Sequence, residues 1–127
     1  MRILLADDHP LFLMRATALL QSSFEVVGTA SNGQELISQA TRLDPDVIVA
    51  DISMPVLTGI EAVHQLREAG SRAKFVFLTV HSEDEFVRAC MSEGALGYVV
   101  KPRMVTDLIP AIKAALSDQS YISRLAS

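Results

Sequence analysis

The ten residues Asp46-Val-Ile-Val-Ala-Asp-Ile-Ser-Met-Pro55 decide the fold class of this chain. Its apolar residues 47–50 follow one another without the polar alternation of a strand that has one face in water. Such a run is typical of a strand that is covered on both faces, as in a parallel sheet. The run ends at Asp51, and a carboxylate beside a buried strand is costly unless it is paired or used. This stretch therefore predicts a parallel sheet with a functional group at its edge.

Four further short apolar runs follow the same scheme, and all but residues 24–30 also lack polar alternation. Segments with helical spacing separate the runs. The runs are residues 2–6, 24–30, 74–79 and 97–100, and the helical segments follow Pro10, Ser31, Thr58, Ser82 and Thr106. The repeated alternation of strand and helix predicts an α/β fold with right-handed crossovers, in which helices cover both faces of the sheet. We expect a three-layer, doubly wound (βα)5 sandwich of the flavodoxin-like kind, with a parallel five-stranded sheet in the order 2-1-3-4-5.

Local signals indicate where three of the helices begin. Ser31 and Ser82 each precede a glutamine or glutamate by three positions, which is the spacing of a capping box. Pro110 lies inside the last helical pattern, where proline removes a backbone hydrogen bond. With Thr106 as the N-cap, Pro110 would stand near the first turn, so we expect that helix to start late or to bend slightly.

Composition bounds the class of protein. The chain has 127 residues, half of them apolar, and a formal net charge of −4. This is the size of one domain, and the apolar content excludes an intrinsically disordered chain. One cysteine cannot form an internal disulfide or a Cys-rich zinc site, which favours a reducing, cytoplasmic setting. No apolar run approaches the roughly 18 residues of a membrane span, and the mildly acidic composition disfavours nucleic-acid binding by this chain itself.

Polar side chains follow the predicted strands at one edge of the sheet. Asp7 and Asp8 follow the first strand, Asp51 the third, and Thr79 and Lys101 stand at the ends of the fourth and fifth. The carboxyl ends of parallel strands share an edge, which is where open α/β sheets bind ligands. Three carboxylates in one crevice require a shared proton or a cation, and oxygen ligands suit Mg²⁺. Capping of the first helix is an equally good explanation of Asp8 taken alone.

These stretches together resemble the receiver domain of bacterial two-component response regulators. The resemblance rests on Ile3-Leu-Leu-Ala-Asp-Asp-His-Pro10, on residues 46–55 with Thr58-Gly59, on Phe77-Leu-Thr79 and on Gly94-Ala-Leu-Gly-Tyr-Val-Val-Lys-Pro102. The chain is most similar to the NarL/FixJ-type subfamily, in which a LuxR-type helix-turn-helix domain usually follows the receiver domain. The resemblance assigns residues 1–119 to the receiver domain and residues 120–127 to the start of a linker or tail.

The resemblance implies a phosphoryl-transfer site at the sheet edge. Asp51 would be the nucleophile that accepts the phosphoryl group as an acyl phosphate. Asp8, Asp51 and the main-chain carbonyl of Ser53 would ligate Mg²⁺, and Asp7 would hold a metal-bound water. The cation would neutralise charge on the transferring group and align it with the attacking oxygen.

The resemblance also implies a group that pairs with phosphate and a pair that switches. Lys101 would contact the phosphoryl oxygens, and we expect a cis Lys101–Pro102 bond that aims its side chain. Thr79 would move toward phosphorylated Asp51, and Tyr98 would then turn inward. From the residues alone, Thr79 fits a strand-end hydroxyl that caps a turn, and Tyr98 fits an edge-strand aromatic that covers apolar surface.

Two flanking positions are expected to tune the lifetime of the acyl phosphate. Ser53 and His81 stand two residues beyond Asp51 and Thr79. The small Ser53 would let water approach, whereas the larger His81 would hinder or order it. His9 is interpreted as a residue that caps or packs at the start of the first helix.

The resemblance implies a signalling switch whose only catalysis is its own phosphorylation and dephosphorylation. Its expected partners are a sensor histidine kinase and, after phosphorylation, a second copy of the domain. DNA would be contacted only through a domain outside this chain, and no membrane contact is expected. The candidate residues for kinase recognition are Leu11, Phe12, Met14, Arg15 and Arg103.

Three other functions fit part of the pattern. A haloacid-dehalogenase-type phosphatase also uses an Asp after a strand, but it needs a second Asp where Ser53 stands. A flavodoxin-type electron carrier would need a Ser/Thr-rich loop after the first strand, where Asp7 and Asp8 would repel the FMN phosphate. A receiver that stands alone and regulates a protein partner is the main alternative to transcriptional control.

Overall fold

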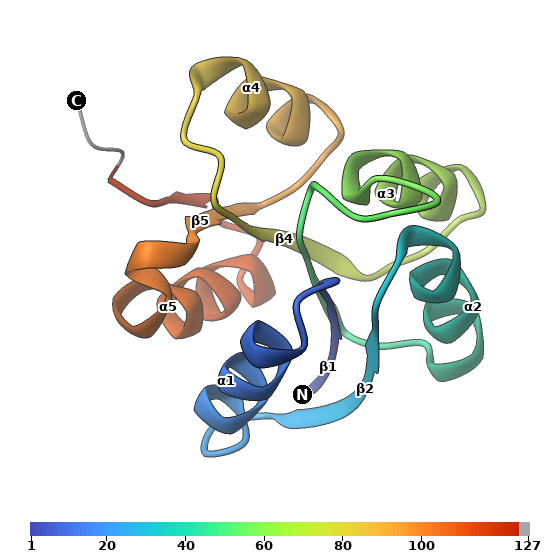
Figure 1. The fold of residues 1–127 in the computed structure, drawn as a ribbon, viewed down its shortest axis with the longest axis horizontal. Helices are drawn as coiled ribbons and strands as arrows, with labels where there is room; N and C mark the ends of the chain where they lie inside the picture. The colour runs from blue at the N-terminus through green and yellow to red at the C-terminus, as the bar shows by residue number, and fades with distance from the viewer. Residues whose placement is uncertain (125–127) are drawn as a thin grey trace.

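The structure, a computed structural model, describes residues 1–124 as a sheet with helices on both sides (Figure 1). The strands are β1 (Arg2–Ala6), β2 (Glu25–Ala30), β3 (Val47–Ala50), β4 (Lys74–Thr79), β5 (Gly97–Val100) and β6 (Tyr121–Ile122). The helices are α1 (Pro10–Leu20), α2 (Gly33–Leu43), α3 (Gly59–Glu68), α4 (Asp84–Ser92) and α5 (Met104–Leu116), with a single 3₁₀ turn, η1, at Lys101–Arg103. None of these helices combines the length and apolarity needed to cross a membrane.

All neighbouring strands are parallel, in the order β2-β1-β3-β4-β5-β6. The predicted α/β class and the 2-1-3-4-5 order are confirmed, and a sixth strand is added beside β5. The order reverses between β1 and β3, where Ala6 is paired with Ala50. This register brings the residues that follow β1 and β3 to the same point at the edge of the sheet.

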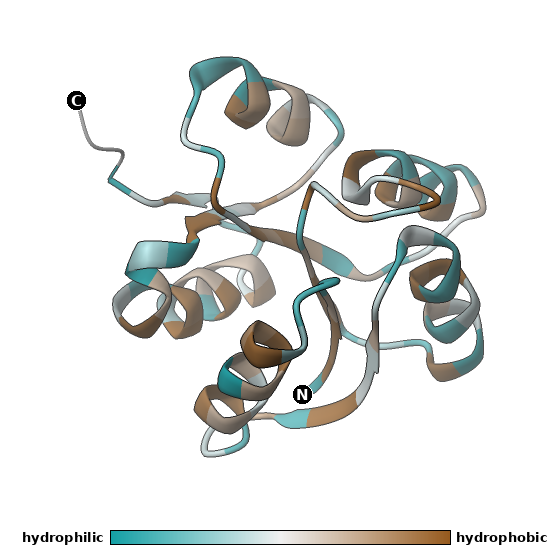
Figure 2. Cartoon of the chain, in the orientation of Figure 1, coloured by the Kyte–Doolittle hydropathy of each residue, from teal (hydrophilic) through white to brown (hydrophobic). Residues whose placement is uncertain are grey.

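The apolar side chains divide between two cores, one on each face of the sheet. Leu4, Ile48 and Phe77 face the side covered by α2, α3 and α4, where they belong to one buried cluster. Ile3 and Val49 face the opposite side, which α1 and α5 cover. Figure 2 shows the strands as mostly apolar ribbons between helices that turn mixed faces outward. Burial on both faces explains why β1, β3, β4 and β5 lack polar alternation.

Helix starts follow local chemistry that the sequence indicated only in part. α3 begins with a full capping box, in which Thr58 and Glu61 each bond the other's main-chain N–H. Asn32, rather than the expected Ser31, caps α2 by accepting a hydrogen bond from the N–H of Glu35 at 2.8 Å. The expected start of α4 at Ser82 is also wrong, because its N-cap is Glu83, without a side-chain bond.

The last helix begins earlier than expected and contains Pro110 in its interior. Arg103, not Thr106, is its N-cap, because η1 runs directly into the helix. The Arg103 Nε donates to Asp107 Oδ2 at 2.8 Å across this first turn. An ion pair at this spacing supports helix from the first turn onward and favours an early start over a late one.

A buried carboxylate on α5 holds the sixth strand. Asp107 is only 1 % exposed and accepts hydrogen bonds from Arg103, from the Tyr121 hydroxyl at 2.9 Å and from the Ser123 hydroxyl at 2.7 Å. The hydrogen bond with Arg103 is the main reason that the pKa of Asp107 is lowered, and it outweighs the effect of burial. Residues 121–123 of the predicted tail thus pair with the sheet, and residues 125–127 lie outside the described residues.

The Asp107→Asn variant should lose stability in a way that depends on pH. Because the pKa is lower in the folded chain, the ionised carboxylate stabilises the fold above its unfolded pKa, near 4, and loses this effect as pH falls through the folded pKa. We expect Asp107→Asn to lower the free energy of unfolding by about 1 to 3 kcal/mol at pH 7. The difference from wild type should shrink below about pH 4.

Urea titrations at several pH values between neutrality and the acid limb measure this difference. Asp118→Asn is the matched control, since it removes the same charge from an exposed residue just beyond the same helix. A deficit in Asp107→Asn that is constant over the whole pH range would contradict the prediction.

Candidate functional site

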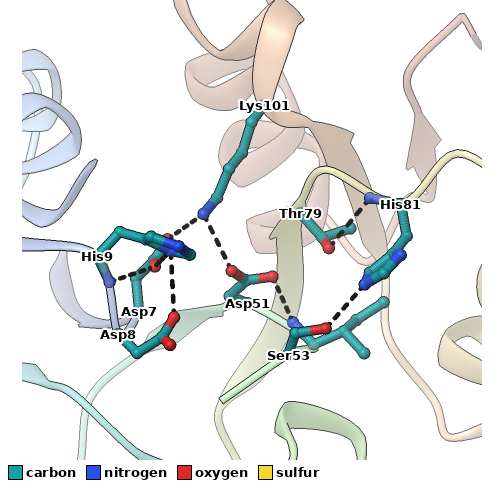
Figure 3. A network of polar contacts seen from close by, with 9 residues as sticks. Asp7, Asp8, His9, Asp51, Ser53, Thr79, His81 and Lys101 are labelled. Atoms are coloured by element: carbon teal, nitrogen blue, oxygen red, sulfur yellow. Dashed lines mark hydrogen bonds and ion pairs between the residues drawn. The ribbon is translucent and has the colours of Figure 1, made fainter. Parts of the chain in front are cut away.

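Five polar residues predicted from strand ends meet at the carboxyl edge of the sheet (Figure 3). Asp7 and Asp8 follow β1, Asp51 follows β3, Thr79 ends β4, and Lys101 follows β5. The backbone fixes this meeting, because the N–H of Asp51 bonds the carbonyl of Ala6 at 2.9 Å and so continues the sheet by one residue. Residues that are 44 positions apart in the chain therefore become neighbours.

The Lys101 ammonium lies between two buried carboxylates. Its Nζ is 2.7 Å from Asp7 Oδ2 and 3.0 Å from Asp51 Oδ2, and all three side chains are almost fully buried. Burial by itself lowers the pKa of Lys101, but the hydrogen bonds with Asp7 and Asp51 outweigh it and raise the pKa. The same ammonium lies 4.2 Å from the centre of the Phe12 ring, a cation–π contact. Lys101 is thus held as a cation that offsets one of the two negative charges.

Asp8 is the more open member of the acidic group, with its side chain one-third exposed. His9 lies beside it, and the His9 Nδ1 is 2.9 Å from Asp7 Oδ1 and 3.1 Å from Asp8 Oδ1. The interpretation of His9 as a residue at the start of α1 is correct for its backbone, since His9 is the N-cap, but its ring belongs to the acidic group. The available signal was its position directly after Asp7 and Asp8.

Asp7, Asp8, His9 and Asp51 could hold one metal ion. Each offers a ligand atom, and these atoms all lie within 4.8 Å of one another. Three of the four donors are carboxylate oxygens, the ligand type that Mg²⁺ prefers. Asp8, on the solvent side, leaves room for the waters that Mg²⁺ retains. The donor set therefore fits a hard divalent cation, and ligation by the Ser53 carbonyl stays a prediction.

The far side of Asp51 is bordered by the loops after β3 and β4. Asp51 Oδ1 accepts a hydrogen bond from the N–H of Ile52 at 2.7 Å. The Ser53 hydroxyl is 2.8 Å from His81 Nε2, so this bond spans the two loops. The His81 ring also stacks on Phe86, with 4.3 Å between ring centres. The two positions expected to tune the lifetime are therefore joined to one another.

The main chain of His81 connects Thr79 with Tyr98. Its N–H donates to Thr79 Oγ1 at 3.3 Å, and its carbonyl accepts from the Tyr98 hydroxyl at 2.7 Å. Tyr98 is fully buried, so it already has the inward position that was expected only after phosphorylation. Burial is the largest cause of the upward shift in its pKa. Tyr98 is a core residue with a satisfied hydroxyl, rather than an aromatic lying on the surface.

The expected cis Lys101–Pro102 bond is wrong, because residues 1–124 contain no cis peptide bond. Lys101 opens the 3₁₀ turn η1 and Pro102 stands within that first turn. The fixed φ of proline suits such a position with an ordinary trans bond. The end of β5 and this turn direct the Lys101 side chain.

Gly59 is a residue of the site whose importance the sequence did not reveal. A Cβ at this position would lie 1.9 Å from the carbonyl oxygen of Asp51. The N–H of Gly59 bonds the carbonyl of Ile52 at 2.8 Å, which closes the loop between β3 and α3. Only glycine permits this approach, so Gly59 fixes the main chain around Asp51.

Comparison with known proteins identifies relatives of this chain. Residues 3–113 match the response regulator receiver domain family. The chain is 36 % identical to the response regulator GacA of Pseudomonas viridiflava over 124 residues, covering 96 % of this chain and 58 % of GacA. It is 36 % identical to the nitrate/nitrite response regulator NarL of Escherichia coli K12 over 123 residues, covering 95 % of this chain and 57 % of NarL. The chain thus spans less than two thirds of the length of these relatives.

Solved structures agree with this result. The isolated receiver domain of RcsB from Salmonella enterica serovar Typhimurium, with the phosphomimetic beryllofluoride, has a TM-score of 0.89 at 26 % identity, covering 98 % of this chain and 94 % of that one. A complex of the response regulator RcsB with DNA has a TM-score of 0.90 at 26 % identity, covering 98 % of this chain and 64 % of that one.

Mg²⁺ should raise the melting temperature of the wild-type chain, and a chelator should reverse the effect. An ion that binds only the folded state adds about 1.4 kcal/mol at ten times its Kd. Asp8→Asn should weaken the response, because Asp8 supplies one of the clustered oxygens. Thermal unfolding over a Mg²⁺ titration measures the shift.

Asp44→Asn is the matched control for that titration. Asp44 is an exposed residue at the end of α2, in a left-handed conformation that asparagine also adopts. Equal responses to Mg²⁺ in wild type and Asp8→Asn would contradict the predicted site.

Proposed function

The chain belongs to the response-regulator receiver domain family, and from this premise we propose that it is a switch that accepts a phosphoryl group on Asp51. The observation that carries the proposal is the buried Asp51 carboxylate, paired with Lys101 beside an acidic group that fits a divalent cation. The site thus combines a nucleophile, a fixed ammonium and clustered oxygen ligands. These are the groups that phosphoryl transfer to a carboxylate needs.

The transfer itself exchanges one bond to phosphorus for another. A carboxylate oxygen of Asp51 forms the new P–O bond while the P–N bond to a phosphohistidine of the kinase breaks. Lys101, which now bonds Asp7 and Asp51, turns its ammonium to the phosphoryl oxygens. Mg²⁺, held by Asp8, Asp51 and the Ser53 carbonyl, would supply positive charge next to the transferring group. The catalysis of the chain is confined to gaining and losing its own phosphoryl group.

The bonds of His81 suggest how the switch operates. The Thr79 hydroxyl accepts from the His81 N–H, and the Tyr98 hydroxyl donates to the His81 carbonyl. When phosphorylation draws the Thr79 hydroxyl toward Asp51, the first of these bonds is lost and the loop after β4 shifts. The His81 carbonyl, which accepts the hydrogen bond from the Tyr98 hydroxyl, then moves with the loop. Phosphorylation needs to change an existing equilibrium by only a few kcal/mol.

Incubation with acetyl phosphate and Mg²⁺, followed by intact-mass analysis, tests the acceptor. The wild-type chain should gain the mass of one phosphoryl group, and the gain should vanish in Asp51→Asn and on chelation of the metal. Asp46→Asn, an exposed carboxylate just before the same strand, is the matched control and should behave as wild type. A wild-type chain that gains no mass would refute the proposed function.

Ser53 and His81 are proposed to set the lifetime of the acyl phosphate through the bond that joins them. This bond holds the His81 ring at the entrance to Asp51, where it limits the approach of water. We expect faster loss of the phosphoryl mass in both Ser53→Ala and His81→Ala. Ser82→Ala, on the exposed side of the same loop, is the control. Decay at the wild-type rate in both variants would contradict the role.

The kinase is proposed to dock beside the site. A groove of about 660 Å³ between α1 and α5 opens at Lys101, and Phe12 and Arg15 line it. Leu11 and Met14, also among the candidates, are exposed on α1 nearby. The fifth candidate, Arg103, is instead engaged with Asp107.

Transcriptional control is proposed from the relatives. The response regulator RcsB has been solved with DNA, and GacA and NarL are longer than this chain. We propose a cytoplasmic regulator that contacts DNA through a helix-turn-helix domain outside this chain. A second copy of the domain is the proposed partner after phosphorylation, and identical size-exclusion elution with and without beryllofluoride would contradict this.

A further inference from the structure

The sixth strand and Ser123, the residue after it, make three hydrogen bonds along β5 and the residue before it. These bonds lie on both sides of the switch residue Tyr98 and end directly before Lys101. The N–H of Tyr121 bonds the carbonyl of Leu96, and the N–H of Ser123 bonds the carbonyl of Tyr98, each at 2.8 Å. The third bond runs in the opposite direction, from the N–H of Val100 to the Ser123 hydroxyl at 3.2 Å. Val100 is the residue directly before Lys101. The last bond therefore anchors the main chain that enters Lys101.

The side chain of Arg103, two residues after Lys101, is bonded to Asp107, which also bonds the Ser123 hydroxyl. The Ser123 hydroxyl donates to Asp107 Oδ2 at 2.7 Å, and Arg103 Nε donates to that oxygen at 2.8 Å. Asp107 and Ser123 are both about 2 % exposed or less. The buried Asp107–Ser123 pair thus bonds the main chain of Val100 on one side of Lys101 and the partly exposed side chain of Arg103 on the other.

We infer that Asp107 and Ser123 are positioning residues for Lys101, so that the sixth strand is part of the phosphoryl site. Lys101 must hold its ammonium between two carboxylates and then turn it toward a phosphoryl group on Asp51. The direction of its side chain is set by the end of β5 and by η1, and the Ser123–Asp107 pair anchors both. The inference rests on the proposed function, because it assigns these residues to the same phosphoryl site.

The coupling acts in both directions, because a binding free energy shared between two sites is reciprocal. If β6 orders Lys101 for the phosphoryl group, then a phosphoryl group that engages Lys101 must in turn stabilise β6. The state of Asp51 would then be communicated to the end of the described chain through Lys101, Val100 and Ser123. The route through Thr79, His81 and Tyr98 meets this one at Ser123, whose N–H bonds the carbonyl of Tyr98.

Beryllofluoride binding in the presence of Mg²⁺ tests the positioning role, with the bound fraction measured by fluorine NMR. Ser123→Ala removes the hydroxyl that joins Val100 to Asp107 and should weaken beryllofluoride binding roughly 5-fold, at the lower end of typical couplings. Tyr121→Phe is the matched control, since it removes another hydrogen bond to Asp107 but leaves the bond between Val100 and Ser123. It should bind beryllofluoride as wild type does. Equal weakening in both variants would show a merely structural anchor and overturn the inference.

Hydrogen exchange of the wild-type chain tests the reverse direction. Beryllofluoride should slow exchange of the N–H groups of Tyr121 and Ser123, which pair with β5. Unchanged exchange at both groups, in a sample that binds beryllofluoride, would overturn the inference and leave the proposed function intact. A wild-type chain that binds no beryllofluoride would instead refute the proposed function, and the inference with it.

Discussion

The structure depends on one buried ionic contact, in which the Lys101 ammonium lies between Asp7 and Asp51. Two carboxylates and one ammonium whose side chains are almost fully buried cannot be stable unless each is paired. Removing the ammonium alone would leave two buried like charges, a change that typically costs about 3 to 5 kcal/mol. The ends of β1, β3 and β5 must therefore stay close together. The sheet register and the close approach of Gly59 to Asp51 both serve this requirement.

The same contact explains why the site can change state. One ammonium offsets only one of two negative charges, so a cation or a phosphoryl group that arrives at Asp51 alters the balance that holds Lys101. Lys101 is anchored through its neighbours to β6, and Asp51 is bordered by loops that meet at His81. A change of charge at Asp51 can therefore affect both β6 and the loop at His81, because short series of hydrogen bonds connect them to the site. Both paths include a residue of β5, one through the Tyr98 hydroxyl and the other through the N–H of Val100.

Regular features were predictable because they depend on local pattern. Residues 47–50 have the composition of a strand buried on both faces, and they form β3 in the interior of the sheet. Features that depend on competition between similar local choices were not predictable. Ser31 and Asn32 can both cap a helix, and in the structure Asn32 is the N-cap of α2. Pro102 could enter a turn with a cis or a trans bond, and the helical turn η1 takes the trans form.

The sixth strand shows a different limit. Residues 121–122 are too short to carry a strand pattern, and their pairing depends on Asp107 and Ser123, which are brought together only when α5 packs against the sheet. His9 is similar, because its position directly after Asp7 and Asp8 places it near them but does not fix the direction of its ring. Contacts of this kind have no periodicity and no characteristic spacing.

The sequence by itself determined the alternation of strands and helices, the parallel sheet, and the polar residues that stand where the strands end. Hydrophobic period and strand-end position are local properties, and the chain carries them residue by residue. Only the tertiary structure decided which carboxylates Lys101 pairs with, how Ser53 reaches His81, and that Ser123 bonds the main chain directly before Lys101. These contacts join residues distant in the chain, and their geometry is set by the register of the strands and by burial, which no local pattern records.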